Sequence, residues 1–67
     1  MTLENATDVR GIDLRMYRLS RRLSLVSVAR EFGASPQRCH AIESTDRPTA
    51  ATRERYWAAI LAADRSR

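Results

Sequence analysis

The chain has 67 residues, of which 43% are hydrophobic and 30% are charged, and its formal net charge at pH 7 is +4. This length allows one domain with one small core, and this composition is typical of a soluble globular fold. Cys39 is the single cysteine, which excludes an internal disulfide, and no apolar run approaches the roughly 20 residues that span a bilayer.

The positive charge is concentrated in the middle of the sequence. Residues 14–43 contain six arginines and two glutamates, which gives them a net charge of +4, whereas residues 1–13 have a net charge of −2. A basic centre behind a slightly acidic leader favours a polyanionic partner. An ordinary solvated surface is the alternative that charge alone leaves open.

The first half of the chain is expected to form an arm and two helices. Residues 1–11 show weak periodicity and are predicted to be a flexible arm, followed by a helix over 12–22. Ser24 is a suitable N-cap for a second helix over 25–32. Gly33 should end that helix, because glycine adopts the left-handed conformation at little steric cost.

Two further helices complete an all-α, four-helix domain over residues 12–64. Ser35 should cap the third helix at about 36–44, and Pro36 fits its first turn, where no backbone N–H is needed. Thr49 or Thr52 should cap a fourth helix at about 52–63, and residues 65–67 are expected to fray. No segment alternates as a strand would, and no fifth helix is predicted.

The predicted third helix has an apolar side and a polar side. Cys39 and Ile42, three residues apart, should face the interior. The outward residues are expected to contact DNA bases and are Gln37, Arg38, His40, Ala41 and Ser44. Glutamine pairs well with adenine, and an alanine methyl group can meet thymine in the major groove. Together with the second helix and the glycine turn, this helix would form a helix-turn-helix.

Residues 14–49 resemble the helix-turn-helix of Cro and C1-type phage repressors, the Xre-like family. The matches are Leu14, Tyr17 and Arg18, "LS" at 23–24, "VAREFGAS" at 28–35, "IE" at 42–43 and "RP" at 47–48. The resemblance implies a lambda-repressor-like fold and a regulator that binds double-stranded DNA at an operator. It also implies a cytoplasmic protein of a prokaryote or a phage-infected cell.

The resemblance assigns roles to individual residues as well. It implies that Arg18 and Glu43 form an ion pair between the first and third helices. We expect the DNA phosphates to be contacted by Ser24, Ser35, Arg21, Arg22 and Arg47. Leu25 and Val26 depart from the family, which often has glutamine after this cap, and they are predicted to be exposed. Thr45 replaces the usual glycine.

A single module of this size offers few base contacts, so we expect a homodimer on DNA. The fourth helix is the candidate dimer surface, because an apolar stripe runs along it. The stripe consists of Tyr56, Trp57, Ile60 and Leu61. A core that satisfies the monomer alone should leave either Tyr56 or Leu61 facing outward.

Two other functions remain open at this stage. The segment "REFGASPQRCHAIE" also resembles region four of primary sigma factors, and a helix-turn-helix can serve as a protein-interaction module. Enzymatic activity is not expected: Cys39 and His40 diverge by about 100° on a helix, and no second cysteine or histidine could complete a metal site. No cofactor, metal or small-molecule substrate is predicted.

Overall fold

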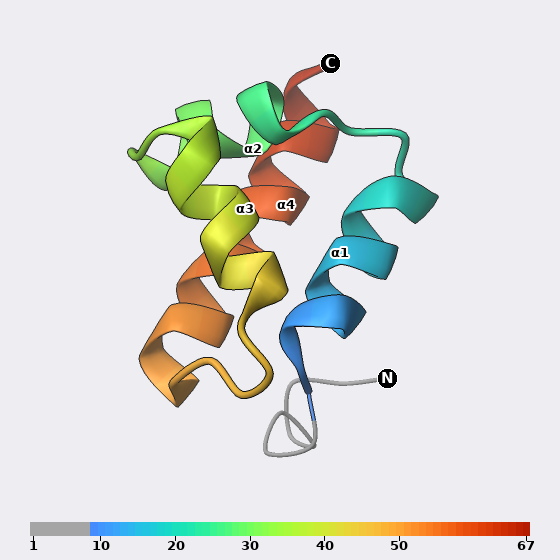
Figure 1. Ribbon diagram of the computed structural model, residues 1–67. Coiled ribbons are helices and arrows are strands. Elements are labelled where there is room, and N and C mark those ends of the chain that lie inside the picture. The colour runs from blue at the N-terminus through green and yellow to red at the C-terminus, as the bar shows by residue number, and fades with distance from the viewer. Residues whose placement is uncertain (1–8) are drawn as a thin grey trace.

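The computed structural model describes residues 9–67, and these residues form four α-helices and no strand (Figure 1). The helices are α1 (Gly11–Ser20), α2 (Leu25–Phe32), α3 (Pro36–Ser44) and α4 (Ala50–Ser66). The prediction of a small all-α domain with four helices is therefore confirmed. Figure 1 shows α3 in front of α4, with α1 beside them.

The described end of the predicted arm is packed against the domain. Residues 1–8 lie outside the described residues, but Val9 is only 4% exposed and belongs to the core. Gly11 already belongs to α1, and its backbone N–H donates to the Thr45 carbonyl at 3.1 Å. The prediction that residues 9–11 are flexible is wrong, because this hydrogen bond joins them to the loop after α3.

Local capping sets most of the helix boundaries. The hydroxyls of Ser24 and Ser35 accept the backbone N–H groups of Ser27 and Arg38, each at 3.1 Å, at the starts of α2 and α3. Gly33 ends α2 in the left-handed region at φ 81°. These three residues are the boundary signals that the sequence predicts, and both helices have the predicted ranges.

The outer helices differ from the prediction at their ends. α1 stops at Ser20, and Arg22 adopts a positive φ of 58° before the chain turns into α2. α4 is capped by Thr49 and continues to Ser66, so the expected fraying of residues 65–66 is not observed. An ion pair between Arg67 and Asp64, at 2.9 Å, stabilises this last turn.

The core lies where α4 packs against α2 and α1, and α3 packs against both of these helices. Its largest fully buried side chains are Tyr56, Leu14, Ile60, Val28 and Cys39. Phe32 meets the ring of Tyr56 edge-on, with centroids 5.4 Å apart. All four helices therefore contribute to one apolar core.

The proposed dimer surface on α4 requires correction. Tyr56 and Ile60 are fully buried within the monomer, and Trp57 stacks on Tyr17 of α1 with ring centroids 4.2 Å apart. Leu61, the fourth candidate, is half-buried. Tyr56 and Ile60 therefore belong to the monomer core, whereas Trp57 and Leu61 are half-buried at its edge, where α1 and α2 pack against α4.

Instead, the exposed apolar side chains lie mainly on α1. Ile12, Met16 and Leu19 are 50%, 58% and 45% exposed, and their spacing places them on one outward face of the helix. Leu14 is buried on the opposite face, and Tyr17 is half-buried. The apolar residues of α1 therefore divide between the core and the surface.

Candidate nucleic-acid interface

α3 presents the face that the sequence predicts. Cys39 is fully buried and Ile42 is 7% exposed, so the inner side of the helix is in the core. The five outward residues are all exposed, namely Gln37, Arg38, His40, Ala41 and Ser44. The orientation of the helix is therefore confirmed, and contact of this face with DNA remains a prediction.

A buried ion pair fixes α3 relative to α1. Arg18 Nε donates to Glu43 Oε2 at 2.7 Å, and Arg18 Nη2 donates to Glu43 Oε1 at 3.0 Å. The remaining Nη1 donates to the Leu23 carbonyl at 2.8 Å. The hydrogen bonding that Arg18 donates to the Glu43 carboxylate raises the pKa of Arg18 above its ordinary value. The predicted pair is thus present, and its bidentate geometry constrains both distance and orientation.

Tyr56 of α4 joins the same pair. Its hydroxyl donates to Glu43 Oε2 at 2.5 Å, so the carboxylate of α3 receives donors from both α1 and α4. Burial is the main cause that raises the pKa of Tyr56, followed by the hydrogen bond to Glu43. The inner side of α3 is therefore held by a polar cluster, Arg18–Glu43–Tyr56, as well as by apolar packing.

Two grooves flank the outward face of α3. The first, here the α1 groove, runs between α1 and α3; residues lining it include Ile12, Arg15, Leu25, His40 and Ser44. The second, here the loop groove, runs between α3 and the α3–α4 loop; residues lining it include Arg38, Ala41, Thr45, Arg47, Thr49 and Thr52. The exposed side of α3 is thus a ridge with arginines on both sides.

Little negative charge faces this ridge. Glu43 is the acidic residue of α3, and it is 5% exposed and paired with Arg18. Asp46, in the loop after α3, is bound by Arg10 at 2.9 Å. The arginines at positions 15, 38 and 47 are exposed. The ridge and its borders therefore present a positive field to solvent.

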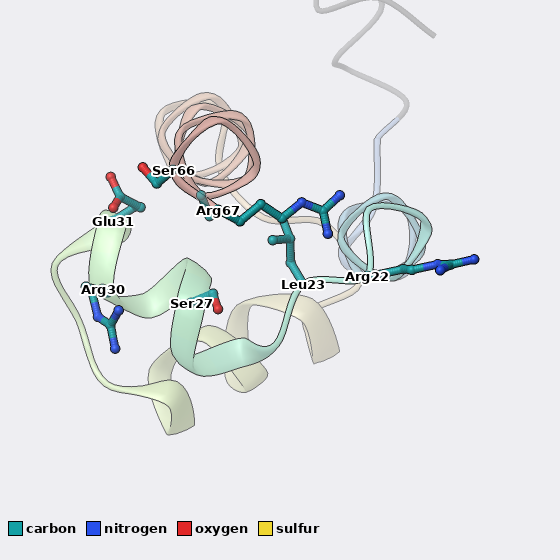
Figure 2. A pocket seen from close by; sticks show the side chains of 8 residues that line it. Arg22, Leu23, Ser27, Arg30, Glu31, Ser66 and Arg67 are labelled. Carbon is teal, nitrogen blue, oxygen red and sulfur yellow. The ribbon is translucent and has the colours of Figure 1, made fainter.

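The structure separates two predicted phosphate contacts from the ridge. Arg21 lies near α4: its Nη1 is 3.3 Å from Asp64 Oδ2, and its guanidinium lies over the Tyr17 ring. Arg22 lines a hollow between α2 and the end of α4, with Ser27 and Arg67 (Figure 2). In this view the Arg22 side chain extends away from Arg67. Neither Arg21 nor Arg22 therefore lines the two grooves beside α3.

The two capping serines remain candidates for phosphate contact. Ser24 and Ser35 are exposed and lie at the N-termini of α2 and α3, where backbone N–H groups and the helix dipole favour an anion. Each hydroxyl uses an acceptor site for its cap, which leaves the Ser35 proton available for donation, and the Ser24 proton as well when Ser27 is the donor between them. Ser24 also lies 3.0 Å from the Ser27 hydroxyl, and either group can be the donor.

Three residues that the sequence reasoning did not select contribute to this site. Arg15 borders the ridge on the α1 side, and Leu25 is half-buried and packs against the core. Arg53 is buried and donates to the Pro48 carbonyl at 2.7 Å, which holds the loop next to Arg47. The expectation that Leu25 is exposed is wrong, whereas Val26 is 54% exposed.

The sequence signals for these three residues are weak. The helical period groups Arg15 with its neighbours on α1, but it carries no information on where α1 meets α3.

Thr45, which replaces the expected glycine, adopts an extended conformation at the end of α3, and its hydroxyl donates to the Ala41 carbonyl at 2.8 Å. The helix therefore ends without a left-handed residue.

No family model matches the chain, and neither a curated protein nor a solved structure shows significant similarity to it. Among residues 9–67, no helix has the length and apolar character needed to cross a bilayer. In the same range, no three histidine, cysteine, aspartate or glutamate side chains lie together as a metal site would require. The geometry of the ridge is therefore the feature that bears on function.

Alkaline pH should destabilise the fold through two buried groups. Burial raises the pKa of the Cys39 thiol above its ordinary value of 9.0, and burial and Glu43 raise the pKa of Tyr56. As pH rises, the unfolded chain then loses these protons before the folded chain does. The contribution of the two groups to the free energy of unfolding is therefore complete below about pH 9 and decreases as pH rises further. The measurement is urea unfolding at pH 8 and pH 10.5.

The matched variants for this pH effect are Cys39→Ala and Tyr56→Phe. Each removes one titrating group, and the double variant should lose less stability between the two pH values than the original chain does. The chain has no lysine, which limits the other groups that titrate in this range. An equal loss of stability in the double variant would contradict the assignment.

Proposed function

We propose that this protein is a sequence-specific DNA-binding transcriptional regulator, repressor-like, that acts by occupying an operator. α3 enters the major groove and directs Gln37, His40, Ala41 and Ser44 to base edges, with Arg38 at the flank. Ser24, Ser35, Arg15 and Arg47 hold the phosphates on either side. The proposal places the protein in the cytoplasm of a prokaryotic or phage-infected cell.

A single observation carries this proposal: the exposed ridge of α3 is free of acidic side chains and lies between grooves lined with arginine. A helix with short polar side chains fits the width of the major groove, and the flanking cations meet the phosphates of the two strands. Arg18 neutralises the acidic residue of α3 in the interior. Charge and shape thus favour the same ligand.

Fluorescence anisotropy with a labelled random duplex is the first test. The protein should bind at low salt, and the logarithm of the binding constant should fall linearly with the logarithm of salt concentration. Selection from a random duplex pool, followed by footprinting, should then yield a preferred sequence. Absence of binding at low salt would contradict the proposal.

The substitution Gln37→Ala should reduce sequence preference at one base pair. Loss of a bidentate contact to adenine should cost on the order of 1–3 kcal/mol on the preferred duplex and much less on random duplex. Gln37 is exposed at the start of α3, so the melting temperature should remain close to that of the original chain. An unchanged base preference would remove Gln37 from the reading face.

The substitution Arg47→Ala should weaken all sequences by a similar factor. Loss of one phosphate contact should also reduce the salt slope by about one. Arg65→Ala is the matched control, because Arg65 is exposed on α4 beside Phe32 and Arg55, away from the ridge. The control changes net charge equally and should leave the salt slope nearly intact. Equal effects of the two variants would mean that net charge alone drives binding.

A protein-interaction module that contacts the transcription machinery is the second candidate. The exposed apolar stripe Ile12, Met16 and Leu19 on α1 favours it, since exposed apolar patches mark interaction surfaces. Such a module would not bind random duplex at low salt, and RNA polymerase would retain it in a pull-down experiment. The substitution Met16→Asp should abolish that retention while leaving the core residues unchanged.

Two copies on one operator remain part of the first proposal, although Tyr56 and Ile60 of α4 are buried within the monomer. Recognition helices of a dimer would read half-sites about 34 Å apart, one turn of duplex. Sedimentation of the protein with a footprinted duplex measures this stoichiometry. A one-to-one complex on a full-length site would contradict the dimer and leave DNA binding in place.

A further inference from the structure

Leu25 forms the floor of a shallow hollow at one end of the ridge. This corner hollow lies where the first turn of α2 meets the first turn of α3, and it is lined by Leu25, Pro36, Gln37 and His40. Leu25 and Pro36 supply apolar atoms, whereas Gln37 and His40 supply polar groups. Leu25 is half-buried and packs against the core, so the floor is fixed by the fold.

We propose that the corner hollow receives the C5-methyl group of a thymine in the major groove and that Leu25 is a specificity-determining residue. This inference rests on the proposed function, because it requires α3 to lie in the groove. Among the groups that the four standard base pairs present there, the thymine methyl is the apolar one, and the others are hydrogen-bond donors and acceptors. An apolar floor beside base-reading side chains is complementary to that group.

The polar residues of the corner hollow favour thymine over 5-methylcytosine, which carries the same methyl group. Gln37 is suited to adenine, the base that pairs with thymine, through its N6 and N7 groups. Recognition of cytosine uses a carboxylate that accepts from the N4 amine, and the corner hollow has no acidic residue. One A·T pair thus offers its adenine to Gln37 and the methyl group of its thymine to Leu25.

The neighbouring residue Val26 provides an internal comparison. Val26 is 54% exposed and follows Leu25 directly, yet it is not among the residues that line the corner hollow or the α1 groove. The two side chains are both aliphatic and differ in whether they border α3. Truncation of each therefore separates contact in the corner hollow from general apolar exposure.

The test replaces thymines of the selected duplex with deoxyuridine, one at a time. Deoxyuridine pairs like thymidine and lacks only the methyl group. For the original chain, one position in each half-site should bind about fourfold more weakly, the factor expected for one buried methyl group. Leu25→Ala should bind the thymine and uracil duplexes equally, whereas Val26→Ala should keep the fourfold difference. Melting curves establish that both variants are folded.

The outcomes separate this inference from the proposed function. Equal affinity for thymine and uracil at every position in the original chain would overturn the inference and leave DNA binding intact; this comparison needs no variant. Affinity for a 5-methylcytosine·guanine pair equal to that for the thymine·adenine pair would overturn the assignment to thymine. Failure to bind any duplex would overturn both proposals.

Discussion

Replacement of Glu43 with alanine should lower the free energy of unfolding by about 3–5 kcal/mol, the cost of leaving a buried charge without its partner. Arg18 is 6% exposed, and its Nε and Nη2 both donate to Glu43. The Tyr56 hydroxyl would lose its acceptor in the same variant. A domain of this size has only a few kcal/mol of stability, so Glu43→Ala should be largely unfolded. Circular dichroism with urea measures the change.

Two comparison variants distinguish the buried pair from the loss of a carboxylate in general. Glu54→Ala removes an exposed carboxylate of α4 and should change stability by less than about 0.5 kcal/mol. The double variant Arg18→Met/Glu43→Leu replaces both charges with apolar groups and should recover much of the stability that Glu43→Ala loses. If Glu43→Ala melts like the original chain, the buried pair contributes no net stability.

Replacement of Gly11 with alanine should have the second largest effect. A Cβ atom at this position would lie 2.6 Å from the Glu43 carbonyl oxygen and 2.8 Å from that of Ile42, and it would also collide with the Thr45 carbonyl. These are backbone atoms at the end of α3, so α1 would have to move away. We expect a loss of about 3 kcal/mol, at the upper end of overpacking effects.

Gly33→Ala is the matched control for this second prediction. Gly33 has a φ of 81°, and a Cβ built on it meets nothing within 4 Å. Its cost should therefore be the conformational penalty alone, about 1 kcal/mol. Urea unfolding of both variants gives the comparison. An equal effect of the two substitutions would mean that α1 and α3 are not in close contact at Gly11.

The close approach at Gly11 also links stability to the proposed activity. A shift of α1 would change the α1 groove, where Arg15 lies beside His40 and Ser44. Gly11→Ala should consequently weaken DNA binding even at temperatures where the variant is folded. Gly33→Ala changes the turn between α2 and α3 without this contact and serves as the comparison.

Boundaries defined by local chemistry were predictable from the sequence. Ser24, Gly33 and Ser35 mark the ends of α2 and α3 correctly, because a side-chain cap or a left-handed glycine acts within a few residues. The inner face of α3 was also predictable, since Cys39 and Ile42 are apolar on an otherwise polar helix. Local signals thus gave the orientation of the candidate reading face.

Features that depend on tertiary packing were predicted less well. On α1, apolar character does not report burial: Ile12 and Met16 are 50% and 58% exposed, while Leu14 is fully buried. On α4 the apolar stripe was assigned to a dimer, but α1 and α2 cover Tyr56 and Ile60. The period of a helix identifies its apolar residues, and it does not say which other helix covers them.

The same limit explains the errors at the candidate site. Arg21 and Arg22 are close to Ser24 in sequence, yet Arg21 turns toward Asp64 of α4. Arg15 and Leu25 were missed because they border α3 only after folding. Residues on α3 itself were found from the sequence, whereas residues that border it from other helices required the structure.

The Arg18–Glu43–Tyr56 cluster and the buried residues Cys39 and Ile42 hold α3 by its inner face. Exchange of the exposed side chains at positions 37, 38, 40, 41 and 44 therefore leaves every described support of the helix untouched. If the proposed function holds, gene duplicates of such a domain can diverge in the DNA they select while retaining one scaffold. A library randomised at these five positions should yield mostly folded proteins, so the exposed face of α3 can be varied independently of the fold.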